Sequence, residues 1–253
     1  MNKPPMFGDF EAQRHWMEIT YHLPVAEWYR QSPNNNLQYW GLDYPPLTAF
    51  HSLLMGALSH QLSPRWVALN ESRGIAITEH KLFMRNTVVF ADLLIFIPAV
   101  LLFWHRAQRP TSLRDKAVAA VVCLLYPGLI LIDHGHFQYN CISLGLCLWG
   151  IVLLREGYCH WASLLYTLAL NYKQMELYHA PPFFFYLLGR VWLQHHNTRS
   201  RITAVVKLGA VVLGTTAFIW LPFMVPPASP LDVVQRLFPL ARGLYEYTWY
   251  KPW

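Results

Sequence analysis

Residues 8–16 form the densest group of ionisable side chains in a largely apolar chain. In the string GDFEAQRHW, Asp9, Glu11, Arg14 and His15 fall within two turns if the segment is helical. An Asp at a helix start is most often an N-cap that accepts hydrogen bonds from the first turn. A carboxylate with one free oxygen can also take the proton from a reacting hydroxyl. We therefore consider Asp9 a candidate general base and the other three side chains candidate substrate ligands.

Two further strings combine rings with hydrogen-bonding side chains. Asp43 and Tyr44 lie in QYWGLDYPP, and aromatic rings beside a carboxylate occur both in sugar-binding clefts and in membrane-interface belts. In DHGHFQYN, the side chains of His134, His136 and Gln138 could bind phosphate or sugar hydroxyls, or could belong to a polar turn between two helices. The two histidines could also ligate a metal with Asp133, but this is a weak signal because no third histidine is spaced to complete a site. We expect no metal.

Lys173 is the only basic residue in the short segments 133–140 and 171–176. A single cation at the membrane edge is well placed to bind a lipid phosphate. The alternative is an i, i+3 ion pair with Glu176. Asp92 lies inside an apolar run, where an acid costs about 2.5–3.5 kcal/mol on insertion scales. We expect Asp92 to face a partner on another helix.

The composition of the 253 residues indicates a membrane protein. Hydrophobic residues make up 54% and charged residues 13%, whereas a soluble domain typically has about 25% charged residues. The net charge of +6 lies largely in short loops, which favours a role in membrane topology over nucleic-acid binding. The four cysteines lack CxxC spacing, so we interpret them as buried apolar residues without disulfides or metal.

Six apolar stretches follow residue 85, and we expect each to cross the membrane as a helix. They are Asn86–Trp104, Ala117–Ile132, Cys141–Leu154, Trp161–Leu170, Leu177–Trp192 and Ile202–Val225. The first and last approach or exceed the roughly 20 residues that a span needs, while the middle four need their semi-polar flanks. The alternative, a soluble protein with buried helices, leaves too few polar faces to make a water-soluble surface.

Loop charge predicts the orientation of this bundle. Loops 105–116, 155–160 and 189–201 carry eight Lys and Arg residues, whereas segments 133–140 and 171–176 carry one. Because positive charge accumulates on the cytosolic side, the three basic loops are predicted to be cytosolic.

The same rule divides the chain into a non-cytosolic region 1–85, a membrane bundle 86–225 and a non-cytosolic tail 226–253. In the first region an apolar stripe predicts a helix from Asp9 that ends at Pro24, and Arg14 can pair with Glu18 on it; the stripe is Ala12, Trp16, Ile19 and Leu23. We expect Leu47–Leu62 to be an amphipathic helix in the interface rather than a seventh span. The predicted fold class is all-α, a polytopic transmembrane helical bundle with amphipathic helices near its N-terminus.

Four strings together resemble one known family. GDFEAQRHW, QYWGLDYPPLTAFHS, LYPGLILIDHGHFQYN and NYKQMELYHAPPF are similar to strings of the dolichyl-phosphate-glucose-dependent α-1,3-glucosyltransferases of asparagine-linked glycosylation. The likeness is nearly continuous from Phe7 to Leu244. GDFEAQRHW as a whole and QYWG favour the members that add the first glucose to the lipid-linked oligosaccharide. The members that add the second glucose are the alternative.

The resemblance implies a GT-C fold in the endoplasmic reticulum membrane, with the active site facing the lumen. It implies dolichyl phosphate glucose as donor, a dolichyl-pyrophosphate-linked high-mannose oligosaccharide as acceptor, and an α-1,3 linkage formed by inversion. The catalytic carboxylate of the family corresponds to Asp9, and its second luminal acid corresponds to Asp43. Near the leaving phosphate, Lys173, His134 and His136 are the candidate ligands. No cofactor is implied, and the sequence has no Gly-rich phosphate loop.

The sequence departs from the family at both ends. Members have a span before GDFEAQRHW and further spans after the string RGL at residues 242–244, so we expect this chain to be a truncated form. A second hypothesis is therefore an inactive membrane protein that only binds the lipid-linked glycan. A transporter is a third hypothesis, but we find no internal repeat that would support it.

Overall fold

The structure is a computed structural model, and it describes residues 8–75, 77–107 and 112–238. These residues form helices and no strand, which confirms the all-α prediction. The N-terminal part contains α1 (Gly8–His22), η1 (Val25–Glu27), α2 (Pro46–Leu62) and η2 (Pro64–Val67). The remaining helices are α3 (Thr78–Ala91), η3 (Asp92–Phe96), α4 (Ile97–His105), α5 (Leu113–Leu124), α6 (Pro127–Ile130), η4 (Leu131–Phe137), α7 (Asn140–Arg155), α8 (Cys159–Tyr172), η5 (Gln174–His179), α9 (Ala180–Gln194), α10 (Thr198–Met224) and α11 (Pro230–Leu237).

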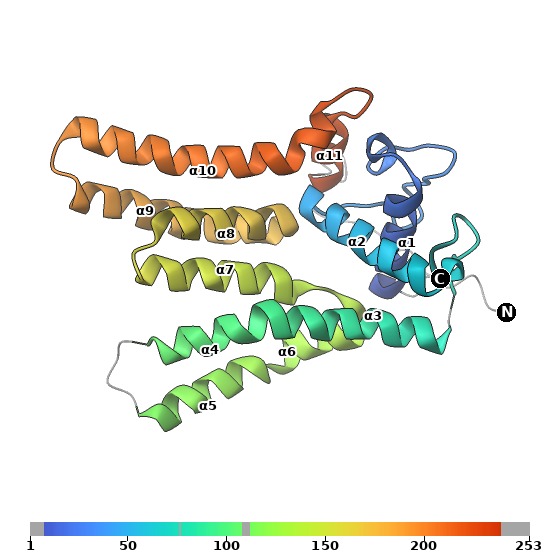
Figure 1. Cartoon of the computed structure of the whole chain (residues 1–253), viewed down its shortest axis with the longest axis horizontal. Helices are drawn as coiled ribbons and strands as arrows, with labels where there is room; N and C mark the ends of the chain where they lie inside the picture. Colours follow the sequence, from blue (N-terminus) through green and yellow to red (C-terminus); the bar gives the residue numbers. More distant parts are fainter. Residues whose placement is uncertain (1–7, 76, 108–111, 239–253) are drawn as a thin grey trace, which may run out of the picture.

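The longer helices lie side by side, from α10 at one edge to α5 at the other (Figure 1). Helix α7 lies between them and packs along α8 on one side and α4 on the other. Helices α1 and α2 pack against each other at one end of this bundle. At the opposite end lie the end of α4, the start of α5, and the two basic loops that join α7 to α8 and α9 to α10. Asp9 on α1 is therefore at the other end of the bundle from the arginine-rich loops.

Among the described residues, three helical stretches are long and apolar enough to cross a membrane: Thr78–His105, Leu113–Phe137 and Thr198–Met224. The first begins at Thr78 rather than at the expected Asn86, because its polar first turns continue directly into the apolar part. The expected boundary at residue 85 thus falls inside a helix.

The other three expected spans also form helices, but short ones. Helices α7, α8 and α9 have 16, 14 and 15 residues, and a span across the bilayer needs about 20. The segment expected to be an interfacial helix is α2, which begins one residue earlier, at Pro46.

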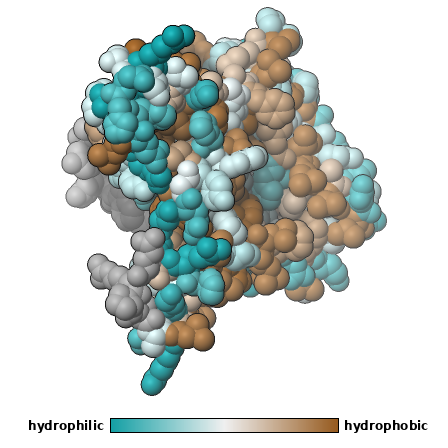
Figure 2. Space-filling view, turned by 60° about the vertical axis from the view of Figure 1, so that its left-hand side comes forward, coloured by the Kyte–Doolittle hydropathy of each residue, from teal (hydrophilic) through white to brown (hydrophobic). Residues whose placement is uncertain are grey.

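Apolar side chains cover the outside of the long helices. On α10, Phe218 is 79% exposed and Leu213 is 71% exposed. Figure 2 shows hydrophobic side chains along the helices behind the hydrophilic end that comes forward in that view. Contiguous apolar surface of this extent is typical of contact with lipid.

Helix α1 is fixed by the apolar stripe that the sequence predicts. Its four members are 0–8% exposed, and they share a core with side chains of α2, α10 and α11 such as Ala49, Phe223 and Val233. Helix α2 approaches α1 closely at Gly56, where an added Cβ would lie 2.5 Å from the carbonyl oxygen of Met17. This packing holds the N-terminal end of α1 against the bundle.

Candidate functional site

Asp9 lies in the first turn of α1, directly after a glycine whose backbone is left-handed. Gly8 has φ of 58°, a region that L side chains rarely adopt, so the chain can turn into α1 at this point. The Asp9 side chain is 27% exposed. Its Oδ2 accepts a hydrogen bond from Nε2 of Gln138 and lies 3.2 Å from Nε2 of His136. Among the described residues these contacts all involve Oδ2, which leaves Oδ1 able to accept a proton.

The partners of Asp9 come from the sharp turn between η4 and α7. Phe137 has φ of 78°, which for a bulky side chain costs about 1–3 kcal/mol unless its surroundings hold it there. The Phe137 ring packs edge-on against Phe10 at 5.2 Å and Tyr139 at 5.5 Å. After this strained residue the backbone is extended at Gln138, whose side chain reaches Asp9.

Gln138 forms hydrogen bonds to both Asp9 and Lys173. While its Nε2 donates to Asp9, its Oε1 accepts from Nζ of Lys173 at 2.8 Å and from Nδ2 of Asn140 at 3.0 Å. Oδ1 of Asn140 accepts a second hydrogen bond from Lys173. The carboxylate of Asp133 accepts from Nδ2 of Asn140 at 2.7 Å. A continuous chain of hydrogen bonds therefore links the candidate base to Lys173.

The Lys173 ammonium is held in a largely buried position. The residue is 8% exposed, and Nζ lies 4.8 Å from the centre of the Tyr44 ring. Burial lowers the pKa of Lys173 from its ordinary value, and the charges of Asp133, Asp9 and Asp43 oppose that shift. Glu176 is not its ion-pair partner, because that carboxylate lies 2.7 Å from Nδ1 of His179. The Lys173 ammonium thus contacts the amide oxygens of Gln138 and Asn140 and the ring of Tyr44.

Two cavities meet at Tyr44. A small one of about 100 Å³ is lined by both Asp9 and Asp43, together with Trp16 and Trp40. A larger one of about 1040 Å³ is lined by polar and apolar groups; the polar members include His136, Gln138, Asn140 and Lys173, and the apolar members include Phe96, Val122, Ile132 and Leu144. The structure therefore brings the two expected acids to the small cavity and Lys173 to the larger one, and Tyr44 lines both.

The two histidines of DHGHFQYN have different partners. His136 faces Asp9, whereas Nε2 of His134 lies 2.8 Å from Oδ2 of Asp92. The expectation that Asp92 has a partner on another helix is confirmed. His134 lies beside Asp92 rather than at either of the two cavities described above, so its assignment to the donor phosphate has no support in the geometry.

Three expected substrate ligands are buried in α1 and face away from these cavities. The side chains of Glu11, Arg14 and His15 have 0% exposure. The Arg14 guanidinium donates to Glu11 at 2.7 Å and to Glu18 at 2.7 Å, which confirms the predicted pair with Glu18. These three side chains therefore have a structural role instead of the expected contact with a substrate, because this face of α1 packs against the loop 68–74.

That loop completes the buried ionic cluster. The carboxylate of Glu18 accepts from the backbone N–H of Asn70 at 2.7 Å, and Ser72 Oγ lies 2.6 Å from Arg14. Although burial opposes ionisation of Glu18, the adjacent His15 imidazole and Arg14 guanidinium lower the pKa of Glu18 to about 2. Buried charges are stable only when paired in this manner.

The four cysteines are free; Cys141 and Cys147 are buried as expected, whereas Cys123 and Cys159 are only half-buried. Among the described residues one group could hold a metal ion, formed by Cys147, Glu176 and His179 within 4.8 Å. Its closest contact is the ion pair between Glu176 and His179.

Asn140 carried no role in the sequence analysis, and Asp133 was considered there only as part of a weak metal signal. Asn140 connects Gln138, Lys173 and Asp133, and Asp133 also accepts from the backbone N–H groups of Asn140 at 3.1 Å and Cys141 at 2.8 Å. The sequence did offer a signal for them: Asp133 and Asn140 are polar residues close to the start of the apolar helix α7, and the first N–H groups of a helix need acceptors.

Comparison with known proteins decides the family. The model of the ALG6, ALG8 glycosyltransferase family matches residues 2–253. The chain belongs to this family. The resemblance noted from four strings is confirmed, and the ALG6, ALG8 family consists of membrane glycosyltransferases, in agreement with the long apolar helices.

Three relatives carry the name dolichyl pyrophosphate Man9GlcNAc2 alpha-1,3-glucosyltransferase. The protein of Rattus norvegicus is 54% identical over 248 residues, which is 96% of this chain and 48% of the relative. That of Gallus gallus is 52% identical over 244 residues, again 96% and 48%. That of Saccharomyces cerevisiae is 44% identical over 250 residues, 96% of this chain and 45% of the relative. The chain thus spans about half the length of these relatives.

Proposed function

We propose that the chain transfers glucose from dolichyl phosphate glucose to a dolichyl-pyrophosphate-linked high-mannose oligosaccharide. The product would carry an α-1,3 linkage formed by inversion, as in assembly of the lipid-linked oligosaccharide for N-glycosylation. The observation that carries this proposal is the hydrogen-bond chain from Asp9 through Gln138 to Lys173, set at the edge of a large cavity. The relatives' names, which specify Man9GlcNAc2, favour the acceptor of the first glucose over that of the second.

Asp9 acts as the general base. Its Oδ1 accepts the proton of the attacking mannose hydroxyl while the new C–O bond forms and the bond from the glucose anomeric carbon to the phosphate oxygen breaks. Gln138 and His136 hold Oδ2, so the carboxylate cannot rotate freely. A positioned base of this kind contributes about 10²–10⁴-fold to the rate.

Lys173 binds the donor phosphate. Its ammonium already lies among the oxygens of Gln138 and Asn140, and a phosphate oxygen entering the larger cavity would replace one of them. The leaving group is a phosphate anion, so its departure needs stabilisation of charge rather than a proton. The apolar wall of the same cavity suits the first isoprene units of a dolichyl chain.

In a cell we infer an endoplasmic reticulum membrane protein whose Asp9 end faces the lumen. The separation of α1 from the three basic loops supports this orientation, because basic loops remain in the cytosol. The regions 1–85 and 226–253 would then be luminal, except that the first turns of α3 belong to the first membrane helix. Residues 239–253 lie outside the described residues.

The experiment is a transfer assay with the purified chain in lipid vesicles. Dolichyl phosphate glucose labelled in the sugar is supplied with a dolichyl-pyrophosphate-linked Man9GlcNAc2 acceptor, and the product is digested with an α-1,3-specific glucosidase. We expect label in the oligosaccharide, released by that enzyme, with dolichyl phosphate glucose but not with a nucleotide glucose. Label transfer from the nucleotide sugar alone, or no transfer from the lipid donor, would contradict the proposal.

A further inference from the structure

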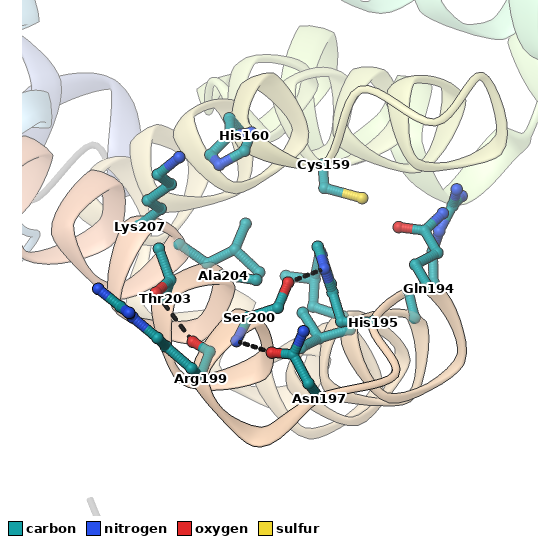
Figure 3. A pocket seen from close by; sticks show the side chains of 14 residues that line it. Cys159, His160, Gln194, His195, Asn197, Arg199, Ser200, Thr203, Ala204 and Lys207 are labelled. Carbon is teal, nitrogen blue, oxygen red and sulfur yellow. Dashed lines mark hydrogen bonds between the residues drawn. The ribbon is translucent and has the colours of Figure 1, made fainter.

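The basic end of the bundle contains a cavity that the proposed reaction does not use. It has a volume of about 500 Å³ and lies between the start of α8, the end of α9 and the first turns of α10 (Figure 3). In Figure 1 these segments are at the opposite end of the bundle from α1. We refer to it as the basic pocket. Its volume is in the range of about 300–1,000 Å³ that is usual for small-molecule sites.

The basic pocket is lined by cations without compensating acids. Arg190, Arg199 and Lys207 contribute guanidinium and ammonium groups, and His160 and His195 add imidazoles. None of the lining residues is an Asp or Glu. Within the part of the chain that the structure describes, neither Arg199 nor Lys207 forms an ion pair. The basic pocket therefore has a concentrated positive charge, which favours binding of an anion.

Its polar wall is partly preorganised. Arg190 is held by a hydrogen bond of 2.9 Å from its Nη1 to the carbonyl oxygen of Leu154. Oδ1 of Asn197 accepts from the backbone N–H of Ser200 at 2.7 Å, and Oγ of Ser200 lies 2.5 Å from Nδ1 of His195. Figure 3 shows Lys207 beside His160, with His195, Ser200 and Asn197 on the other side of the cavity.

The remaining wall is apolar, and α10 also carries exposed apolar side chains in the same turns. Leu187, Val191 and Leu208 line the cavity together with the polar groups. On the adjoining turns of α10, Ile202 is 58% exposed and Val206 is 62% exposed. A ligand with a charged head and a hydrocarbon body would satisfy both kinds of wall at once.

We propose that the basic pocket binds the phosphate-bearing headgroup of an anionic membrane lipid in the leaflet that faces the basic loops. Clustered Lys and Arg between membrane helices on the cytosolic side recognise such headgroups. Charge that only determines topology would have no need of a cavity, of a fixed polar wall or of an apolar wall beside it. This inference is independent of the glucosyl transfer, because the pocket and Asp9 lie at opposite ends of the bundle.

The test measures binding of phosphatidylinositol phosphate to the purified chain in phosphatidylcholine nanodiscs. The variant is Arg199→Gln with Lys207→Gln. Each cation near an anionic headgroup contributes a factor of about five to affinity, so the double variant should bind about 25-fold more weakly. Arg199→Lys, which keeps the charge, should retain most of the binding.

The matched control removes the same charge from another basic loop, at the opposite edge of the bundle. Arg114→Gln with Lys116→Gln alters two cations that do not line the pocket, and we expect its affinity to stay within twofold of the unmodified chain. An equal loss in both double variants would show that overall surface charge, and not the pocket, attracts the lipid, and would overturn the proposal. Thermal unfolding of each variant identifies any loss caused by misfolding.

A second arm distinguishes a lipid from a free phosphate. Soluble inositol phosphate should compete with the nanodisc lipid only weakly, because it lacks the hydrocarbon that meets Leu187 and Val191. Competition as strong as that of the lipid itself would contradict a lipid ligand and indicate a soluble phosphate compound instead.

Discussion

Helix α1 carries two sets of charged residues whose surroundings are opposite. Asp9 lines a cavity and keeps 27% of its side chain exposed, whereas Glu11, Arg14 and Glu18 have 0% exposure. The two sets lie within a few residues of each other, but on different faces of the same helix. One face meets the loops that carry Gln138 and Lys173, and the other meets the loop 68–74. The charged residues of α1 therefore have two roles: Asp9 is the candidate reactive group, and Glu11, Arg14 and Glu18 form the ionic cluster that holds the helix in place.

The largest effect on the structural face is expected from Arg14→Gln. This change leaves the buried carboxylates of Glu11 and Glu18 without their cation, which costs about 3–5 kcal/mol. At about 2–4 °C per kcal/mol for a chain of this size, thermal unfolding should shift down by roughly 6–20 °C. Arg30→Gln, at an exposed pair with Asp232, is the matched control and should cost less than about 1 kcal/mol. Equal shifts of the unfolding temperature for both variants would mean that the buried Arg14 ion pairs stabilise the fold no more than the exposed Arg30 pair does.

Acid should weaken the same cluster through Glu18. Its pKa is about 2 in the folded chain against an ordinary 4.5, so the stability it contributes is complete above pH 4.5 and is lost as the pH falls toward 2. The loss over that window is about 3 kcal/mol. The variant Glu18→Gln should be less stable at neutral pH and should show a smaller decline in that window, whereas the exposed Glu71→Gln should behave as the unmodified chain. A Glu18→Gln chain that declines as steeply as the unmodified one contradicts the pairing.

On the reactive face, Lys173→Gln should change donor binding and leave folding nearly intact. A hydrogen bond to a charged phosphate is worth about 1.5–3 kcal/mol, so the KM for dolichyl phosphate glucose should rise roughly 10–100-fold. Lys81→Gln, exposed on α3, is the control. Because burial lowers the pKa of Lys173 from 10.5, donor affinity should fall with rising pH before an ordinary lysine would lose its proton. A normal KM in Lys173→Gln would remove this residue from the donor site.

The smallest effect is expected at the connection between Asp9 and Lys173. Gln138→Leu removes hydrogen bonds to two charged groups, the Asp9 carboxylate and the Lys173 ammonium. Each is worth about 1.5–3 kcal/mol, but both form before the transition state as well as in it, so only about 1–1.5 kcal/mol should appear in kcat, which falls roughly 5–15-fold. Gln61→Leu, at an exposed position of α2, should have no effect on kcat. A Gln138→Leu enzyme with unchanged kcat would show that Asp9 needs no help from this side chain.

Much of the fold follows from the sequence, but not the lengths of its helices. The stripe of α1 appears as predicted, because a helix in contact with an apolar core repeats apolar residues with its own period. All six apolar stretches lie in helices, but only three of them belong to described helices long and apolar enough to cross a membrane. The apolar stretch from Asn86 does not show where its helix begins, because the helix starts at Thr78 and includes polar residues such as Glu79 and Lys81. Likewise, nothing in α7, α8 or α9 marks how far each continues beyond its apolar part.

Residue type pointed to part of the candidate site, but not to its hydrogen-bond network or to the burial of Glu11, Arg14 and His15. Asp9, Asp43, Gln138 and Lys173 could be chosen by residue type, and the structure brings them to two adjoining cavities. The burial of Arg14 could not be predicted, because its partner Ser72 lies 58 residues away and has no distinguishing pattern. The strained turn at Phe137, which directs Gln138 toward Asp9, has no glycine to signal it.

The most direct test of the account is the kinetics of Asp9→Asn in the transfer assay. If Asp9 is the base, kcat should fall about 10²–10⁴-fold, while the KM values for both lipid substrates and the unfolding temperature stay as in the unmodified chain. A variant that keeps most of its kcat, or that loses activity only through a higher acceptor KM, would contradict the assignment of Asp9 as the group that takes the proton.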